Sequence, residues 1–186
     1  MNETIFDTFP VLETPRLLLR ALAPTDAELL LRFNGDVEAL RYIAREPYES
    51  IDEAREKLAS FLASFAEHHA LWWAFELRTG DETIGYGGLF GIDSIANNAE
   101  IGYGLLRGFS GAGYASEAVL EIKRFGGEDM NLHRIYALVD PDNFASARVL
   151  IKAGFSKEGC LRHHSFARGR YFDHDIFAWV DTSPGR

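Results

Sequence analysis

Apolar residues recur along this chain with two different patterns, and the change comes near residue 70. Between residues 24 and 69 they return every three or four positions, which predicts amphipathic helices. Beyond residue 70 come three runs typical of β-strands: 71–77, 83–92 and 99–105. The segments that join these runs are short, and short connections favour an antiparallel meander.

The helical region follows a strand predicted over residues 14–22, and residues 1–13 are expected to be a loosely held lead-in. A short helical piece is also expected over residues 37–43. Two helix starts carry capping-box pairs: Thr25 with Glu28, and Ser50 with Glu53. The long helix that starts at Ser50 is predicted to bury one stripe: Leu58, Phe61, Leu62 and Phe65. Of the two adjacent tryptophans, Trp72 and Trp73, one is expected on each face of a strand.

The second half alternates strands with two helices. After a glycine loop, the predicted elements are a helix over 114–125, a strand over 132–139, a helix capped by the turn 140–143, and strands over 156–166 and 170–180 that bend at Arg168-Gly169. The tail 182–186 is expected to be unstructured. The pattern therefore predicts one domain, residues 1–186 with a core of about 12–180. Its class is α/β, with a mixed, mostly antiparallel sheet flanked by helices.

The glycine loop is the clearest candidate for a binding site. Gly108, Gly111 and Gly113 lie within six residues, between a predicted strand and a predicted helix. Glycine allows positive φ, so consecutive N–H groups can turn toward one anion, and the helix start adds further unpaired N–H groups. The glycine loop is therefore a candidate phosphate-binding cradle, although loops of this kind also arise for steric reasons alone. The motifs of ATP-binding and dinucleotide-binding loops are absent from this stretch.

Charge and composition narrow the classes of partner. The chain carries 19 basic and 28 acidic residues, a net charge of −9, which argues against a nucleic-acid surface. Nine of the acids lie between residues 24 and 56, where they suit a solvated helix face or a cationic substrate. Cys160 is the only cysteine, so no disulfide framework or thiolate zinc site is expected. No metal and no membrane span are predicted, and a cytoplasmic location is expected.

Three motifs occur in order: 99–103 (AEIGY), the glycine loop ending at 113–118 (GYASEA), and 143–155, where Asn143, Ser146 and Arg148 precede Gly154-Phe155. Together they resemble the GNAT superfamily of acetyl-CoA-dependent N-acetyltransferases. The branch that acetylates ribosomal-protein amino termini is the most similar, on residues 14–20 and 158–162. The resemblance implies the acyl-CoA N-acyltransferase fold, a bulge near Gly104-Leu105, and acetyl-CoA as acetyl donor.

The resemblance also implies the residues that bind the cofactor. These are Leu105, Leu106, Arg107, Gly111, Ala112, Gly113, Tyr114, Ala115, Ser116, Asn143 and Ser146. The sequence departs from the family at Gly108, where Gln or Arg is usual, so Arg107 either replaces that residue or is a solvated loop arginine. It also has Leu150 where many members carry a Tyr that protonates the leaving thiolate. In the ribosomal branch a Ser takes this role, which points to Ser146 unless that side chain only caps the helix.

Glu100 is the candidate general base, because it has the opposite strand parity to Ile101 and Tyr103. An ion-paired structural role is its alternative. Asn143 is expected to orient the cofactor or cap a helix. The predicted function is acetyl transfer from acetyl-CoA to a primary amine by direct attack in a ternary complex. The acceptor is a protein amino terminus or a small-molecule amine, with a non-catalytic acyl-CoA sensor as the rival class, and the chain is expected to be a monomer or homodimer.

Overall fold

The computed structural model describes residues 1–80 and 82–183. Eight strands form one sheet in the order β1-β2-β3-β4-β5-β6-β8-β7. They are β1 (Leu12–Glu13), β2 (Leu17–Ala21), β3 (Ala70–Leu77), β4 (Thr83–Asp93), β5 (Asn98–Leu105), β6 (Arg134–Val139), β7 (Ser156–Ala167) and β8 (Arg170–Val180). Among the strands of the described residues, β5 and β6 alone pair in parallel. The predicted mixed, mostly antiparallel sheet is confirmed.

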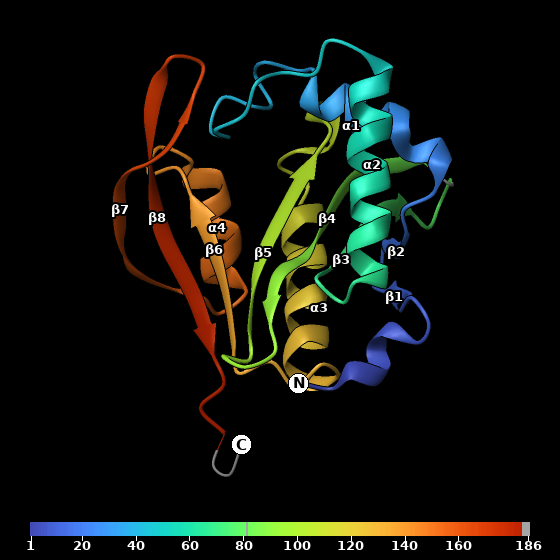
Figure 1. Ribbon diagram of the computed structural model, residues 1–186, viewed down its shortest axis with the longest axis vertical. Helices are drawn as coiled ribbons and strands as arrows, with labels where there is room; N and C mark the ends of the chain where they lie inside the picture. Colours follow the sequence, from blue (N-terminus) through green and yellow to red (C-terminus); the bar gives the residue numbers. More distant parts are fainter. Residues whose placement is uncertain (81, 184–186) are drawn as a thin grey trace.

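Four α-helices cover the sheet: α1 (Ala27–Asn34), α2 (Ile51–Ala66), α3 (Tyr114–Glu128) and α4 (Phe144–Lys152). Helices α1 and α2 pack on one face of the meander, and α3 with α4 pack on the other (Figure 1). Two apolar clusters result: the larger cluster lies on the face covered by α3 and α4, and the smaller cluster lies on the face covered by α1 and α2. The two adjacent tryptophans divide between them as predicted, because neighbouring side chains of a strand point to opposite faces.

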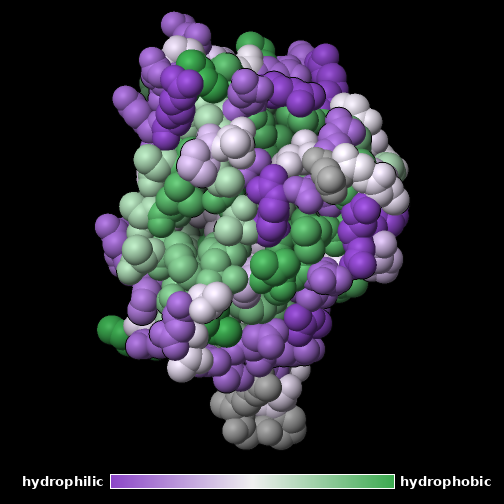
Figure 2. Space-filling view, turned by 90° about the vertical axis from the view of Figure 1, so that its right-hand side faces the viewer, coloured by the Kyte–Doolittle hydropathy of each residue, from purple (hydrophilic) through white to green (hydrophobic). Residues whose placement is uncertain are grey.

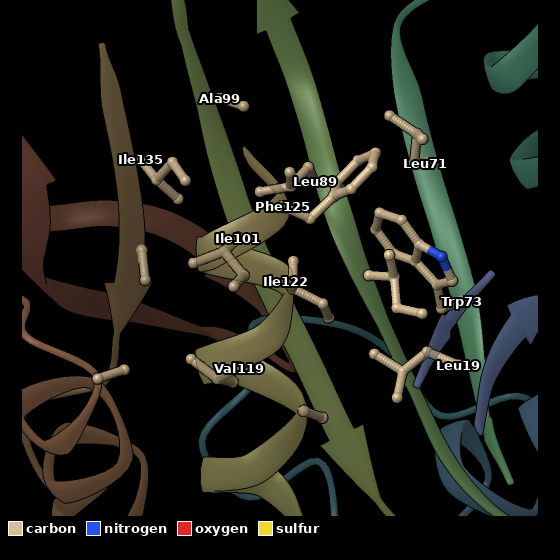
Figure 3. Packing of buried hydrophobic residues seen from close by; sticks show 14 of the residues in the cluster. Leu19, Leu71, Trp73, Leu89, Ala99, Ile101, Val119, Ile122, Phe125 and Ile135 are labelled. Atoms are coloured by element: carbon tan, nitrogen blue, oxygen red, sulfur yellow. The ribbon is translucent and has the colours of Figure 1, made fainter. Parts of the chain in front are cut away.

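The larger cluster lies between α3 and the sheet. Trp73 is fully buried there and faces Ile122 and Phe125 of α3 (Figure 3). The ring of Trp73 meets that of Phe125 edge to face, with centroids 5.6 Å apart. Ala118 and Val119, in the N-terminal half of α3, belong to the same cluster, so the whole helix that follows the glycine loop is packed on the sheet.

The sheet opens between β5 and β6. Their pairing runs from Asn98 opposite Arg134 to Glu100 opposite Tyr136, and beyond this point the two strands diverge (Figure 1). The expected bulge near Gly104-Leu105 is wrong, since the β4–β5 register is regular from Gly85–Leu105 to Phe90–Glu100. Gly104 instead makes room for a ring, because a Cβ there would lie 2.3 Å from Cζ of Phe33.

The expectation of a loosely held lead-in is also wrong. Phe6 is 7% exposed and stacks on His68, with ring centroids 4.4 Å apart. The indole N–H of Trp73 donates to the carbonyl oxygen of Pro10 at 2.8 Å. Apolar side chains among the first residues thus cover the end of the larger cluster. The strand predicted over 14–22 is shorter, and its first residues form a turn between β1 and β2.

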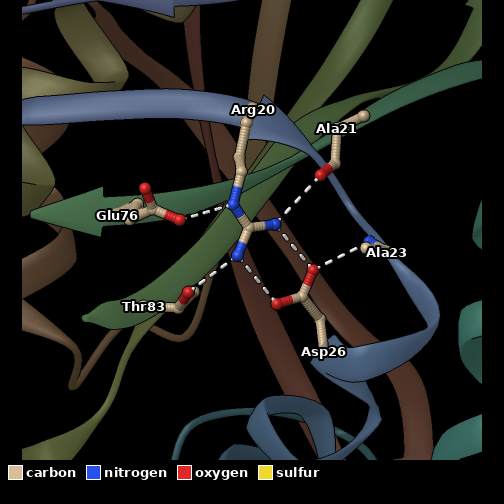
Figure 4. A network of polar contacts seen from close by, with 6 residues as sticks. All are labelled: Arg20, Ala21, Ala23, Asp26, Glu76 and Thr83. Atoms are coloured by element: carbon tan, nitrogen blue, oxygen red, sulfur yellow. Dashed lines mark hydrogen bonds and ion pairs between the residues drawn. The ribbon is translucent and has the colours of Figure 1, made fainter. Parts of the chain in front are cut away.

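The first helical region begins differently from the prediction. A 3-10 turn (Pro24–Asp26) precedes α1, and Asp26 rather than Glu28 accepts a hydrogen bond from the N–H of Ala23, at 2.8 Å. The carboxylate of Asp26 also binds the guanidinium of Arg20, which contacts Glu76 and Thr83 as well (Figure 4). Asp26 is therefore placed by a partly buried ion-pair network that the local capping pattern does not reveal.

Helix α2 begins as predicted, with the hydroxyl of Ser50 accepting from the N–H of Glu53. Its buried stripe differs from the prediction: Leu62, expected to be buried, is 42% exposed, whereas Ala54, which was not predicted, is fully buried. Figure 2 shows the molecule from the right-hand side of Figure 1, with hydrophilic residues along the upper part of this view and hydrophobic residues gathered in its middle. The helix expected over residues 37–43 is instead a series of turns.

The turns of residues 35–50 meet the tip of the β7–β8 hairpin. This hairpin bends at Arg168 and Gly169, both with positive φ, as the sequence predicts. The N–H of Arg168 donates to a carboxylate oxygen of Glu46 at 2.6 Å, and its guanidinium donates to the carbonyl oxygen of Ile43 at 3.0 Å. The two halves of the opened sheet are therefore bridged at one end. Residues 184–186 of the predicted unstructured tail lie outside the described residues.

Candidate active site at the junction of two cavities

A cavity of about 530 Å³ follows the opened edge of β5. Its walls come from β5, from the glycine loop with the first turn of α3, and from α4. Three cationic residues and one acidic residue line it: Arg107, Arg148, Lys152 and Glu38. In a chain of net charge −9, this local excess of positive charge suits a phosphate-bearing ligand. We call this space the cofactor cavity.

The glycine loop has the backbone conformation that an anion cradle requires. Gly111 and Gly113 have φ of +83° and +86°, a region that side chains rarely adopt. Gly113 is the N-cap of α3, so the free N–H groups of the first helical turn lie directly after it. Ser116 adds a hydroxyl to the lining. The loop fits the pyrophosphate of coenzyme A.

A contact from outside the loop holds it in place. The Arg16 guanidinium donates to the carbonyl oxygen of Ala112 at 3.0 Å and pairs with the Glu117 carboxylate at 2.7 Å. Glu117 also accepts from the hydroxyl of Thr14 and from the N–H of Arg16, and the Arg16 guanidinium stacks on the ring of Tyr114. The residues just before β2 therefore fix the loop against α3.

The cavity gathers most, though not all, of the predicted cofactor residues. The lining includes Leu105, Arg107, Gly111, Gly113, Ala115, Ser116, Asn143 and Ser146. Leu106 is not part of it: its side chain is 6% exposed in the smaller cluster, and its N–H donates to Ile84. Ala112 and Tyr114 contact Arg16 instead. Arg107 lines the cavity while its side chain remains 68% exposed, with Nε 3.7 Å from Asp36.

A second cavity, of about 320 Å³, lies on the face of the sheet that α1 and α2 cover. Its floor is aromatic: Phe33, Phe61, Trp72, Tyr86 and Phe90. The rings of Phe61 and Phe90 each stack on the ring of Trp72, at centroid distances of 4.2 and 5.0 Å. We call this space the acceptor cavity, because it meets the cofactor cavity at residues that line both: Phe33, Tyr42, Ile43, Tyr103, Gly104, Asn143 and Ser146.

Glu100 lines the acceptor cavity at the point where β5 and β6 part. Burial raises the pKa of its carboxyl group from 4.5 to about 7. Among the described residues no cation pairs with it, so the ion-paired structural alternative fails. A carboxyl group with a pKa near neutrality can take up a proton at physiological pH.

Tyr103 and Ser146 form a hydroxyl pair at the junction. Tyr103 Oη lies 2.8 Å from Ser146 Oγ and 3.3 Å from the carbonyl oxygen of Ser146. Burial raises the pKa of Tyr103 to about 12, so its hydroxyl stays protonated at neutral pH. Ser146 does not cap α4: the cap is the Asn143 side chain, which accepts from the N–H of Ser146 at 3.1 Å.

The sequence analysis missed Tyr103 as a functional residue. Its alternation with Glu100 placed it on the opposite face of β5, where Ile101 is indeed buried against α3. Tyr103 reaches the junction because β5 is a free edge at this level, so its side chain can extend past the edge toward α4. No local pattern signals this, since the edge appears only once the strands diverge.

Comparison with known proteins agrees with this geometry. Residues 16–156 match the model of the acetyltransferase (GNAT) domain. The uncharacterized N-acetyltransferase YoaA of Bacillus subtilis is 36% identical over 172 residues, which cover 92% of this chain and 97% of that protein. Among solved structures, RimL, a ribosomal L7/L12 α-N-protein acetyltransferase in complex with coenzyme A, has a TM-score of 0.84 at 22% identity, covering 92% of this chain and 98% of that one. A spermidine N-acetyltransferase from Vibrio cholerae, in complex with CoA and spermine, has a TM-score of 0.80 at 26% identity, covering 90% and 96%.

The sheet that opens beside a glycine loop is thus the fold of acyl-CoA N-acyltransferases. The chain belongs to the GNAT acetyltransferase family. It is an N-acetyltransferase whose acetyl donor is acetyl-CoA and whose acceptor is an amine. No cluster of metal-binding side chains and no helix capable of crossing a membrane occurs in the part of the chain that the structure describes.

Proposed function

We propose that acetyl transfer takes place at the junction of the two cavities, by direct attack of a primary amine in a ternary complex. The observation that carries this proposal is the meeting of the cavities at Tyr103 and Ser146, with Glu100 on the acceptor side. Acetyl-CoA enters along β5 with its pyrophosphate at Gly111–Ser116. Its amide-bearing arm then passes the open edge of β5, whose backbone groups suit such an arm.

Glu100 is the proposed general base. An amine attacks only when neutral, and amino groups have pKa values of about 8 to 10, so most molecules arrive protonated. Glu100 takes one proton from the ammonium, directly or through one water, so that the neutral nitrogen can attack and form the C–N bond, and the second proton that nitrogen loses after attack passes to solvent. Backbone N–H groups of β5 beyond Glu100 are the available donors for the carbonyl oxygen of the acetyl group.

The hydroxyl pair is proposed to protonate the leaving group. As the C–S bond breaks, the sulfur of coenzyme A takes a proton from Ser146 Oγ or Tyr103 Oη. Each hydroxyl can then recover a proton from the other or from solvent. This arrangement supplies the acid that is missing at Leu150, which is fully buried in the larger cluster.

The acceptor is proposed to be a protein amino terminus or a small amine. The structural neighbours point in both directions, since one is named for a ribosomal protein and the other was solved with spermine. Measuring thiol release from acetyl-CoA with peptides and small amines tests the proposal. Turnover with at least one primary amine is expected. Tight binding of acetyl-CoA without turnover across the whole panel would favour the acyl-CoA sensor instead.

A further inference from the structure

Two half-buried cations line the acceptor cavity, Arg45 from the turns before α2 and Lys57 from α2 itself. Arg45 donates to the side-chain oxygen of Asn34 at 2.7 Å, a neutral partner. The ammonium of Lys57 lies 4.7 Å from the ring centroid of Phe61. Across the described residues, neither cation forms an ion pair with a carboxylate.

Some cations of the chain are paired with carboxylates, whereas others among the described residues, such as the exposed Arg148 and Lys152, are not. Six of the paired cations have a carboxylate oxygen within 2.5 to 2.8 Å: Arg16, Arg20, Arg78, Arg124, Arg134 and Lys157. The nine acids of residues 24–56 lie close to Arg45 and Lys57 in sequence, yet none of them lines the acceptor cavity. The suggestion that this acidic run receives a cationic substrate is therefore not supported by the cavity.

The acids that do line the cavity are Glu100 and Asp140. The raised pKa of Glu100 is caused by burial, with no contribution from either cation. The pKa of Lys57 is lowered, first by burial and then by the charge of Arg45. The base and the two cations thus occupy separate parts of one cavity, and the positive charge of the cations is uncompensated.

We infer that Arg45 and Lys57 form an anion subsite for a carboxylate of the acceptor, several bonds away from the amine that is acetylated. The inference rests on the proposed function only in one respect, namely that the amine of the same acceptor is acetylated at the junction of the cavities. An ω-amino acid or a peptide with an acidic residue next to its amino terminus supplies this chemistry. A polyamine, by contrast, would place a cation beside Arg45 and Lys57, where like charges repel.

The first test compares three acceptors of one length with amino groups of similar basicity: 6-aminohexanoate, hexylamine and 1,6-diaminohexane. We expect kcat/KM to be highest for 6-aminohexanoate. Lys57→Met keeps an apolar stem on Phe61 and should lower the ratio of kcat/KM for 6-aminohexanoate over hexylamine by about 10- to 100-fold, the usual worth of a hydrogen bond to a charged group. Arg45→Gln should lower it similarly.

Lys123→Met is the matched control, because Lys123 also lies over an aromatic ring, that of Trp179, outside both cavities. In Lys123→Met the ratio of kcat/KM for 6-aminohexanoate over hexylamine should equal that of the native protein. A peptide pair, one starting Ser-Asp and one starting Ser-Asn, both with amidated ends, tells whether the carboxylate comes from a peptide or a small molecule. A preference for 1,6-diaminohexane, or a ratio unchanged in Lys57→Met, would overturn the inference while leaving acetyl transfer established.

The second test needs no turnover. Calorimetry of hexanoate, which carries a carboxylate but no amine, is compared with that of hexanamide in the presence of coenzyme A. Hexanoate should bind more tightly to the native protein and to Lys123→Met, and about 10-fold or more weakly to Lys57→Met. Equal binding of the two ligands would overturn the anion subsite. The expected binding pattern, without transfer to any amine, would instead count against the proposed function.

Discussion

The cofactor cavity and the acceptor cavity are built from different kinds of structure. The first takes its defining groups from one stretch, residues 105–116, and uses backbone N–H groups at positive-φ glycines. The second collects residues from α1, the turns that follow it, α2, β3, β4, β5, β6, the turn after β6 and α4. A backbone cradle requires glycines at fixed places, whereas an aromatic floor can be assembled from many sequences. Under the proposed function, the donor is recognised by local geometry and the acceptor by long-range packing.

The largest effect is expected where the two cavities meet. Ser146→Ala should lower kcat by about 10² to 10⁴-fold with little change in the KM for acetyl-CoA, because the proton is donated in the transition state. Tyr103→Phe should act on the same step, and the double variant should lose less than the sum of the two in free energy. Steady-state kinetics at saturating acetyl-CoA measures this. A loss of only a few-fold in both single variants would remove the pair from the chemistry.

Glu100→Gln tests the acceptor side. Because the pKa of Glu100 is about 7, the native enzyme should lose kcat/KM below that pH, as the carboxylate becomes protonated. The variant should lose about 10²-fold at neutral pH and recover part of its rate as the pH passes the pKa of the amine. Its affinity for acetyl-CoA, on the other cavity, should not change. Near-native activity of Glu100→Gln at pH 7 would show that another group or water is the base.

Gly113→Val tests the cofactor side. A β-branched residue is strained at a φ of +86°, and the new side chain would also approach the Arg16 guanidinium. We expect the affinity for acetyl-CoA to fall by about 10-fold or more, as measured by calorimetry on a variant shown to be folded by circular dichroism. Gly108→Ala is the control, since a Cβ there meets no atom within 4 Å. Equal affinities of the two variants would contradict the cradle.

The burial of Glu100 also predicts a stability effect that depends on pH. Below pH 4.5 its carboxyl group is protonated in the folded and unfolded states alike. Between pH 4.5 and about 7 the folded protein retains a proton that the unfolded chain releases, so this group's contribution to stability is lost as the pH rises through that window. Glu100→Gln should therefore be more stable than the native protein at pH 8, by about 1–3 kcal/mol, and not at pH 4. Urea unfolding at both values measures this, and an equal difference at the two would contradict the raised pKa.

The smallest effect is expected at the residue that braces the loop from outside. Arg16→Ala removes the contacts to Ala112 and Glu117 but leaves the glycines in place. The KM for acetyl-CoA should rise by a few-fold, because a looser loop must be ordered on binding. Arg55→Ala is the control, as its ion pair with Asp52 is exposed and remote from the loop. A KM equal to that of Arg55→Ala would show that the glycine loop needs no brace.

The same contrast explains what could be predicted from the sequence. The left-handed conformation of Gly111 and Gly113 and the place of Ser116 at the start of α3 were predictable, because backbone conformation and helix starts leave a local signal. Glu100 was proposed as the base from its strand parity, and the structure places it in the lining of the acceptor cavity. Tyr103 was not predicted, because its role depends on β5 being a free edge, and Arg45 and Lys57 were not, because their significance is the absence of acidic partners in space. The shift of the α2 stripe to include Ala54 has a similar cause: tertiary packing decides which side of a helix is buried.

The central claim is that the two cavities share one reaction centre at Tyr103 and Ser146. A crystal structure of the protein with coenzyme A tests it most directly. The account predicts the pyrophosphate at the N–H groups of residues 111–116 and the thiol at the junction, within hydrogen-bonding distance of the Tyr103 or Ser146 hydroxyl. A thiol that ends elsewhere, with the junction filled by side chains or solvent, would contradict it.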